Sequence, residues 1–170
     1  MSRHCYFDTS ALVLWAEASN SSADARAVIG RTAVETLFND ASVSLALSEL
    51  TILEYSNSLI TLWRTSSKPQ FDQSWAEDNL NALMKHVADG RATVVSAPRW
   101  SPEQAIALMT VATRRNVGLK AWDSIHLVTA ANWSNQLGQI VELVTCDEDF
   151  ENFGAVFDFF DNQVVVFRTA

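Results

Sequence analysis

The sequence predicts an α/β fold, a three-layer α/β/α sandwich around a short, mainly parallel sheet. Short apolar runs alternate along the chain with longer segments of helical periodicity, which is the order of elements that βαβ units produce. The apolar runs lack a polar side at every second position, as expected of strands covered by helices on both faces. The chain has 170 residues, a length that fits a single domain over residues 1–170.

Each expected element has a local signal in the sequence. The strands are the apolar runs at residues 3–7, 41–46, 92–96, 140–146 and 164–167. Helices are expected between them, at residues 9–18, 23–38, 48–63, 72–88, 101–116 and 121–136. The clearest helix start is Ser101-Pro102-Glu103-Gln104, which combines an N-cap, a proline in the first turn and a capping-box glutamine. Residues 153–160 are expected to be irregular or a short strand.

The composition excludes several classes of protein. Apolar residues make up 48% and charged residues 19% of the chain, which is typical of a globular protein with a real core and not of disorder. The two cysteines exclude a disulfide scaffold, and both are expected to be buried strand thiols. No apolar run approaches the roughly 18 residues that a membrane span needs. We therefore expect a cytoplasmic protein that does not enter membranes.

The negative charge is concentrated near the C-terminus. The net charge is −8, and residues 121–170 hold eight acidic residues against one arginine. Such a balance disfavours broad electrostatic binding to nucleic acid. It is compatible with a solvated acidic face, and also with a site where a divalent ion inverts the local charge.

Four acidic residues lie where expected strands end or the neighbouring helices begin. They are Asp8, Glu49, Asp123 and Asp147. In a parallel sheet these positions meet at one edge, where open α/β sheets bind their ligands. Converging carboxylates repel one another unless a cation holds them together. Hard oxygen ligands of this kind favour Mg²⁺ or Mn²⁺.

Four segments around these acids resemble the motifs of PIN-domain nucleases. They are residues 6–12 (YFDTSAL), 44–50 (SLALSEL), 121–130 (AWDSIHLVTA) and 143–150 (LVTCDEDF). The chain looks most similar to the VapC-type toxin ribonucleases of toxin–antitoxin pairs. It is longer than a typical member of that family, and Trp122 directly before Asp123 is bulkier than the family pattern.

The resemblance implies Mg²⁺- or Mn²⁺-dependent cleavage of single-stranded RNA. The catalytic residues would be Asp8, Glu49, Asp123 and Asp147. The metal would be held by the three aspartates, with Asp147 bound directly or through water, and either one or two metal ions would satisfy the pattern. Glu49 would be a ligand, a residue that orients water, or the base. Glu54 lies about 140° away from Glu49 on the same helix and is expected to be solvated or salt-bridged.

Further polar residues near the motifs are candidates for supporting the metal or the substrate. Thr9 and Ser10 at a helix start, and Thr145 at a strand end, could bind metal-bound water or phosphate, or simply cap their elements. His126 lies one turn after Asp123 and is expected in the core or behind the site more than in catalysis.

Four charged residues near the third and fourth motifs could each have either of two roles. Asp149, two residues after Asp147, either faces the metal or caps a turn. Arg114, Arg115 and Lys120 form the last basic cluster before the acidic part of the chain. They could contact an RNA backbone, or they could be the ordinary basic end of a helix.

The resemblance also implies partners. A protein antitoxin is expected to present an arginine to the carboxylates, with exposed aromatics such as Trp63 or Trp75 as anchors for the rest of its segment. A homodimer is expected as well. Alternatives are a PIN-like protein-binding module or a housekeeping RNA-processing nuclease. A phosphatase of the haloacid dehalogenase type is disfavoured because Ser10 stands where that family has a second aspartate.

Overall fold

The sheet is parallel throughout and has the strand order β3-β2-β1-β4-β5. The computed structural model describes residues 3–19, 25–99, 101–147, 149–150 and 164–169. Its strands are β1 (Arg3–Phe7), β2 (Val43–Ser48), β3 (Ala92–Val95), β4 (Val141–Thr145) and β5 (Val164–Arg168). Its helices are α1 (Thr9–Glu17), α2 (Ala25–Asn39), α3 (Glu49–Thr65), α4 (Gln73–Ala88), α5 (Ser101–Arg114) and α6 (Ala121–Leu137).

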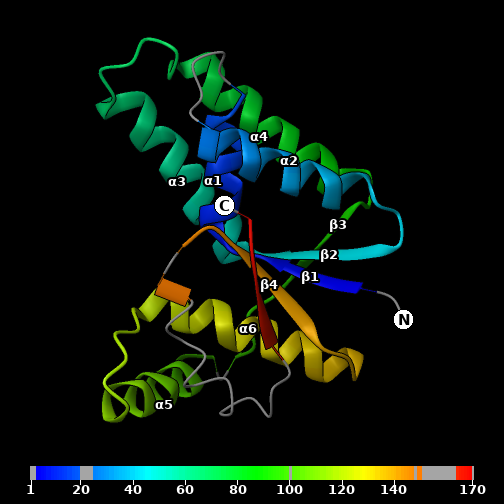
Figure 1. Cartoon of the computed structure of the whole chain (residues 1–170), viewed down its shortest axis with the longest axis vertical. Coiled ribbons are helices and arrows are strands. Elements are labelled where there is room, and N and C mark those ends of the chain that lie inside the picture. Colours follow the sequence, from blue (N-terminus) through cyan, green and yellow to red (C-terminus); the bar gives the residue numbers. More distant parts are fainter. Residues whose placement is uncertain (1–2, 20–24, 100, 148, 151–163, 170) are drawn as a thin grey trace.

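Helices cover both faces of the sheet, as the sequence predicts. Figure 1 shows α1 to α4 on one side and α5 and α6 on the other. The alternation of side chains along β1 explains how one strand serves both layers. Cys5 and Phe7 belong to the core under α1 to α4, whereas Tyr6 between them belongs to the core under α5 and α6. The expected three-layer α/β/α sandwich is confirmed.

The order in which strands are added to the sheet reverses between β1 and β4. From β1 the sheet grows through β2 to β3, and the chain then crosses to the other side of β1 to add β4 and β5. In the register, Tyr6 pairs with Ala46 on one side and with Leu143 on the other. Such a switch point leaves a crevice at the carboxyl ends of the two central strands, which is where ligands of open α/β sheets bind.

Most element boundaries agree with the sequence, and the largest shift is at β2. This strand was expected at residues 41–46 but covers Val43–Ser48. The side chain of Asp40 accepts hydrogen bonds from the backbone nitrogen and hydroxyl of Ser42, so a turn delays the start of the strand. Helix α5 ends at Arg114, two residues early, and Asn116 beyond it is left-handed, with a φ of 58°. The expectation for residues 153–160 lies outside the described residues.

No helix in the described part of the chain has the length and the apolar composition that crossing a bilayer requires.

Candidate metal-binding active site

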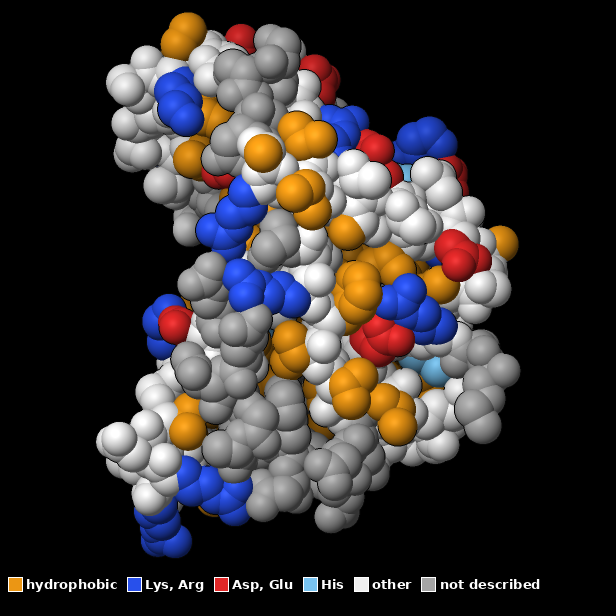
Figure 2. Space-filling model, in the orientation of Figure 1, with side chains coloured by type: hydrophobic (Ala, Val, Ile, Leu, Met, Phe, Trp, Pro, Cys, Tyr) orange, Lys and Arg blue, Asp and Glu red, His pale blue; other side chains and the backbone are white. Residues whose placement is uncertain are grey.

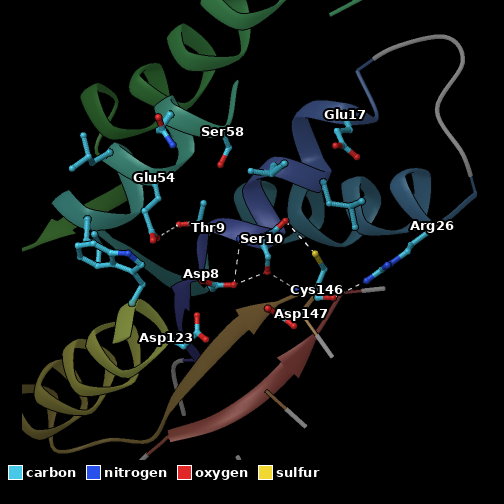
Figure 3. A pocket seen from close by; sticks show the side chains of 16 residues that line it. Asp8, Thr9, Ser10, Glu17, Arg26, Glu54, Ser58, Asp123, Cys146 and Asp147 are labelled. Carbon is cyan, nitrogen blue, oxygen red and sulfur yellow. Dashed lines mark hydrogen bonds between the residues drawn. The ribbon is translucent and has the colours of Figure 1, made fainter. Parts of the chain in front are cut away.

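A cleft of about 850 Å³ opens at the carboxyl ends of β1 and β4. Its lining includes Asp8 directly after β1, Asp147 after β4, and Asp123 in the first turn of α6. These three side chains lie around one space in Figure 3, with Glu54 of α3 across from them. Three of the four acids that the sequence places at this edge therefore do meet in one cleft.

Asp8 is held at the centre of the site by hydroxyl donors. It is the N-cap of α1 and is 5% exposed. Its Oδ2 accepts hydrogen bonds from Ser10 Oγ at 2.5 Å and from Thr145 Oγ1 at 3.0 Å. A buried carboxylate requires such donors, because burial without them would strongly disfavour its charge. The second oxygen, Oδ1, lies 3.8 Å from His126 Nε2.

Thr145 connects the ends of the two central strands. It is the last residue of β4 and is fully buried. Its Oγ1 donates to Asp8 and accepts a hydrogen bond from the backbone nitrogen of Asp147 at 3.0 Å. Asp147 in turn accepts a hydrogen bond from the backbone nitrogen of Asp149 on its Oδ1, at 2.9 Å. Thr145 thus fixes the position of one carboxylate and the backbone that carries another.

Asp123 differs from Asp8 in having an oxygen without a donor. Its Oδ2 is buried and has no hydrogen-bond partner among the residues that the structure describes. Burial raises the pKa of Asp123 to about 6, and the charges of Asp8 and Asp147 act in the same direction, while Lys120 opposes them. An orphaned carboxylate oxygen that faces other carboxylates is in an environment that a cation would stabilise.

Glu54 lines the cleft and is paired there with His126, which agrees with the expected salt bridge, although the sequence did not place Glu54 at the site. Its Oε2 accepts hydrogen bonds from Thr9 Oγ1 and from His126 Nε2, both at 2.7 Å. Burial raises the pKa of Glu54, but the hydrogen bonds from His126 and Thr9 outweigh burial, and the pKa is lowered overall. Because Glu54 is ionised and accepts, His126 carries a proton on Nε2.

His126 lies behind the carboxylates and not at the surface of the cleft. Its side chain is almost completely buried, and its Nδ1 lies 3.0 Å from the hydroxyl of Tyr6. The Tyr6 hydroxyl donates to Ser48, the N-cap of α3. The expectation of a supporting histidine matches this placement, since His126 contacts Glu54 and approaches Asp8 from the core.

Glu49 is not at the cleft, so its expected place in the site is wrong. It is the first residue of α3, is exposed, and accepts a hydrogen bond from Ser96 Oγ at 2.8 Å. The capping box of Ser48 and Thr51 fixes where α3 begins, and the side chain at position 49 bonds to Ser96 and does not line the cleft. Glu54 reaches the cleft about 1.4 turns later on the same helix.

The four charged residues that left two interpretations open (Asp149, Lys120, Arg114 and Arg115) do not line the cleft. Asp149 is paired with Lys120, with 3.3 Å between its Oδ2 and Nζ, and both side chains are more than half exposed. Arg114 and Arg115 are exposed at the end of α5 and are not part of the cleft lining. Their expected contact with RNA stays a prediction, but it would be outside the cleft.

Two further features of the cleft could not be read from the motifs. Arg26 of α2 lines it and donates from Nη2 to the backbone carbonyl of Cys146 at 2.8 Å. Trp122, whose bulk departs from the family pattern, also lines it. Of the two proposed anchors, Trp63 is 38% exposed, but Trp75 is buried and its indole nitrogen donates to Ser19, two residues after α1. The expectation of an exposed Trp75 is wrong.

The three aspartates of the cleft are oxygen donors of the kind that a hard divalent cation binds, although their side chains are not yet arranged to coordinate one. In the described part of the chain no three His, Cys, Asp or Glu side chains are arranged as a metal-binding group. One oxygen of Asp8 and one of Asp147 accept hydrogen bonds from other groups of the protein. The fit comes from three carboxylates on one cleft and from the unpartnered Oδ2 of Asp123, since oxygen ligands are those that Mg²⁺ and Mn²⁺ take.

Solved structures share this architecture over nearly the whole chain. VapBC2 from Rickettsia felis, bound to a DNA fragment from its promoter, matches with a TM-score of 0.62 at 11% identity, over 98% of this chain and 99% of that one. FitAB bound to an IR36 DNA fragment matches with a TM-score of 0.62 at 19% identity, over 97% of this chain and 94% of that one. The fold is PIN-like.

The other comparisons limit what this likeness shows. FitAcB from Neisseria gonorrhoeae matches the PIN-like chain with a TM-score of 0.53 at 17% identity, over 97% of both chains. No family model matches the sequence, and no curated protein matches it. At these identities the likeness establishes the PIN-like fold. Activity and partners do not follow from this likeness and depend on the residues of the site.

Proposed function

We propose that this chain is a Mg²⁺- or Mn²⁺-dependent endoribonuclease that cleaves single-stranded RNA and acts as the toxin of a toxin–antitoxin pair. The observation that carries the proposal is the convergence of Asp8, Asp123 and Asp147 on one cleft of a PIN-like fold. The buried, unpartnered Oδ2 of Asp123 supports it, because a carboxylate oxygen without a donor is costly to bury and a cation would stabilise it.

Each side chain has a part that follows from its contacts. Asp8, Asp123 and Asp147 are the proposed ligands. When bound, the cation lowers the pKa of a coordinated water and polarises a phosphate oxygen. Ser10 and Thr145 fix the Asp8 carboxylate through its Oδ2.

Glu54 is the proposed base or water-orienting residue, in place of Glu49. Thr9 and His126 both bind its Oε2, so they hold the carboxylate ionised and fix its orientation. Its other oxygen, Oε1, is the atom proposed to accept a proton from the attacking water. His126, buried against Tyr6, keeps this carboxylate in place without itself lining the cleft.

The partner is proposed from the acidity of the cleft and from the compared structures. VapBC2 and FitAB are both complexes bound to DNA. By analogy, we propose that this chain also assembles with an antitoxin protein. That protein would present an arginine to the carboxylates, because a guanidinium pairs two carboxylate oxygens at once.

A cleavage assay on an unstructured RNA tests the proposal. We expect the wild type to cut the RNA internally in Mn²⁺ and not in EDTA. Asp8→Asn should lower the rate by roughly a hundredfold or more, beyond the 10–100-fold typical of residues that only support a ligand. Circular dichroism would verify that the variant is folded. Cleavage that persists in EDTA would contradict the metal-dependent mechanism, and no cleavage in Mn²⁺ would favour a PIN-like binding module.

A further inference from the structure

One tryptophan at the cleft is far more exposed than a core residue would be. The structure describes five tryptophans, and Trp122 is the most exposed of them, at 57%. Trp15, Trp75 and Trp133 are all buried. Leaving most of an indole in water forgoes the stabilisation that its burial would give, so such a position suggests a contact with something outside the chain.

The position of Trp122 ties it to the proposed chemistry. It precedes Asp123 directly in the first turn of α6, and both residues line the cleft. Leu53 of α3, which is 66% exposed, lines the cleft as well. The cleft therefore combines carboxylates with an apolar rim, which we define as Leu53 and Trp122.

The charge of the cleft argues against a substrate held by electrostatics. Five acidic residues line it (Asp8, Glu17, Glu54, Asp123 and Asp147), and Arg26 is the basic residue among the described lining. Its guanidinium already donates to the carbonyl of Cys146. On the face shown in Figure 2, lysine and arginine side chains are spread over several elements and form no continuous stripe. Apart from the phosphate at the proposed cation, a nucleic acid in this cleft meets one basic side chain among the described lining, so contacts other than those to phosphates must supply much of its affinity.

We propose that Trp122 stacks on an unpaired nucleobase of the RNA, next to the phosphate that is cut. The inference rests on the proposed function and deepens it. Every base has an apolar face, and stacking on an aromatic side chain holds single strands without depending on charge. In a duplex those faces are covered by neighbouring bases, so the same contact selects single-stranded over double-stranded RNA.

Binding measured by fluorescence anisotropy tests the proposal without requiring turnover. The probes are a labelled 12-nucleotide oligoadenylate and an oligomer of equal length and charge made of abasic ribose. Both are titrated in Ca²⁺, and a denaturing gel verifies that they remain intact. We expect Trp122→Ala to weaken oligoadenylate binding about five- to a hundredfold, and Trp122→Phe to stay within about threefold of the wild type.

The abasic oligomer and a second tryptophan supply the controls. Trp122→Ala and the wild type should bind the abasic oligomer equally, and their dependence on salt should have the same slope, because no phosphate contact is lost. Trp63→Ala removes an exposed tryptophan that does not line the cleft, and it should change neither affinity.

The outcomes separate this inference from the proposed function. If the wild type cleaves RNA but Trp122→Ala binds oligoadenylate as tightly as the wild type does, the stacking proposal is wrong and the indole is left for contact with a protein. An equal loss of affinity on the abasic oligomer would overturn it too. If the wild type neither binds nor cleaves RNA, both the proposed function and the stacking contact are wrong.

Discussion

The two glutamates of α3 lie five residues apart and have different surroundings. Glu49 is exposed at the first position of the helix and accepts a hydrogen bond from Ser96. Glu54 lines the cleft, where Thr9 and His126 hold it. Glu49 is the nearer of the two to the end of β2, yet it is the one outside the site. Helical phase, and not closeness to a strand end, decides which carboxylate reaches the cleft.

The phase is set by the buried side of α3. Thr51, Tyr55 and Leu59 are its buried residues, at intervals of four. At 100° per residue, Glu54 lies about 60° from Thr51 on one flank of this stripe, and Glu49 lies about 80° from Leu59 on the other flank. The flank of Glu54 faces the end of β1, because Thr51 donates to the carbonyl of Phe7 and Glu54 accepts from Thr9. The two flanks can be read from the sequence, but the one that faces β1 is decided by packing.

The largest effect expected from this comparison is on cleavage. Glu54→Gln removes the charge but keeps the shape, and it should lower the rate in Mn²⁺ by about 10–100-fold, as is typical when a residue that orients a metal site is changed. Glu49→Gln is the matched control on the same helix and should stay within about twofold. Initial rates on one RNA substrate measure both. If Glu49→Gln instead lost most of its cleavage rate and Glu54→Gln stayed active, Glu49 would be the base or water-orienting residue, and this assignment would be wrong.

A smaller effect concerns the two aspartates that differ in their donors. The raised pKa of Asp123, about 6 in the folded chain, means that its ionisation opposes folding. This destabilisation is fully present above pH 6 and disappears as the pH falls toward the ordinary value near 4. In EDTA, Asp123→Asn should melt about 2–5 °C higher than the wild type at pH 7, with the difference gone by pH 4.

Thermal melts of both proteins across this pH range provide the measurement. Glu49→Gln, which changes an exposed carboxylate, should keep the wild-type dependence on pH. A lower melting temperature for Asp123→Asn at pH 7 would show that Asp123 is stabilised as an anion in the absence of metal, against this account.

The sequence predicts the fold and the aspartates well because both depend on short-range patterns. Apolar strands alternating with helices leave few arrangements other than a covered parallel sheet. Asp8 and Asp147 directly follow strands, so their place at the sheet edge follows from the strand ends alone. Asp123 is fixed almost as tightly, in the first turn of a helix that precedes β4.

Features that depend on packing between distant elements are harder to predict. Cys146, expected to be a buried strand thiol, lies one residue beyond β4 and is half-buried. Arg26 reaches the cleft from α2, and no local pattern marks it. Trp75 of α4 is buried where its indole nitrogen donates to the carbonyl of Ala16 in α1 and to Ser19, residues nearly 60 positions away in the chain. Burial of this kind is set by tertiary contacts that neither composition nor periodicity specifies.

The most direct test of the central claim is the melting temperature in Mn²⁺ against EDTA. If the cleft carboxylates form a cation site, saturating Mn²⁺ should raise the melting temperature of the wild type by about 5–10 °C, because a ligand at a hundredfold excess over its Kd contributes about 2.7 kcal/mol. Asp123→Asn should lose this shift, and Glu49→Gln should keep it. Equal melting temperatures of the wild type in Mn²⁺ and in EDTA, or a full shift in Asp123→Asn, would contradict the claim that these aspartates hold a metal ion.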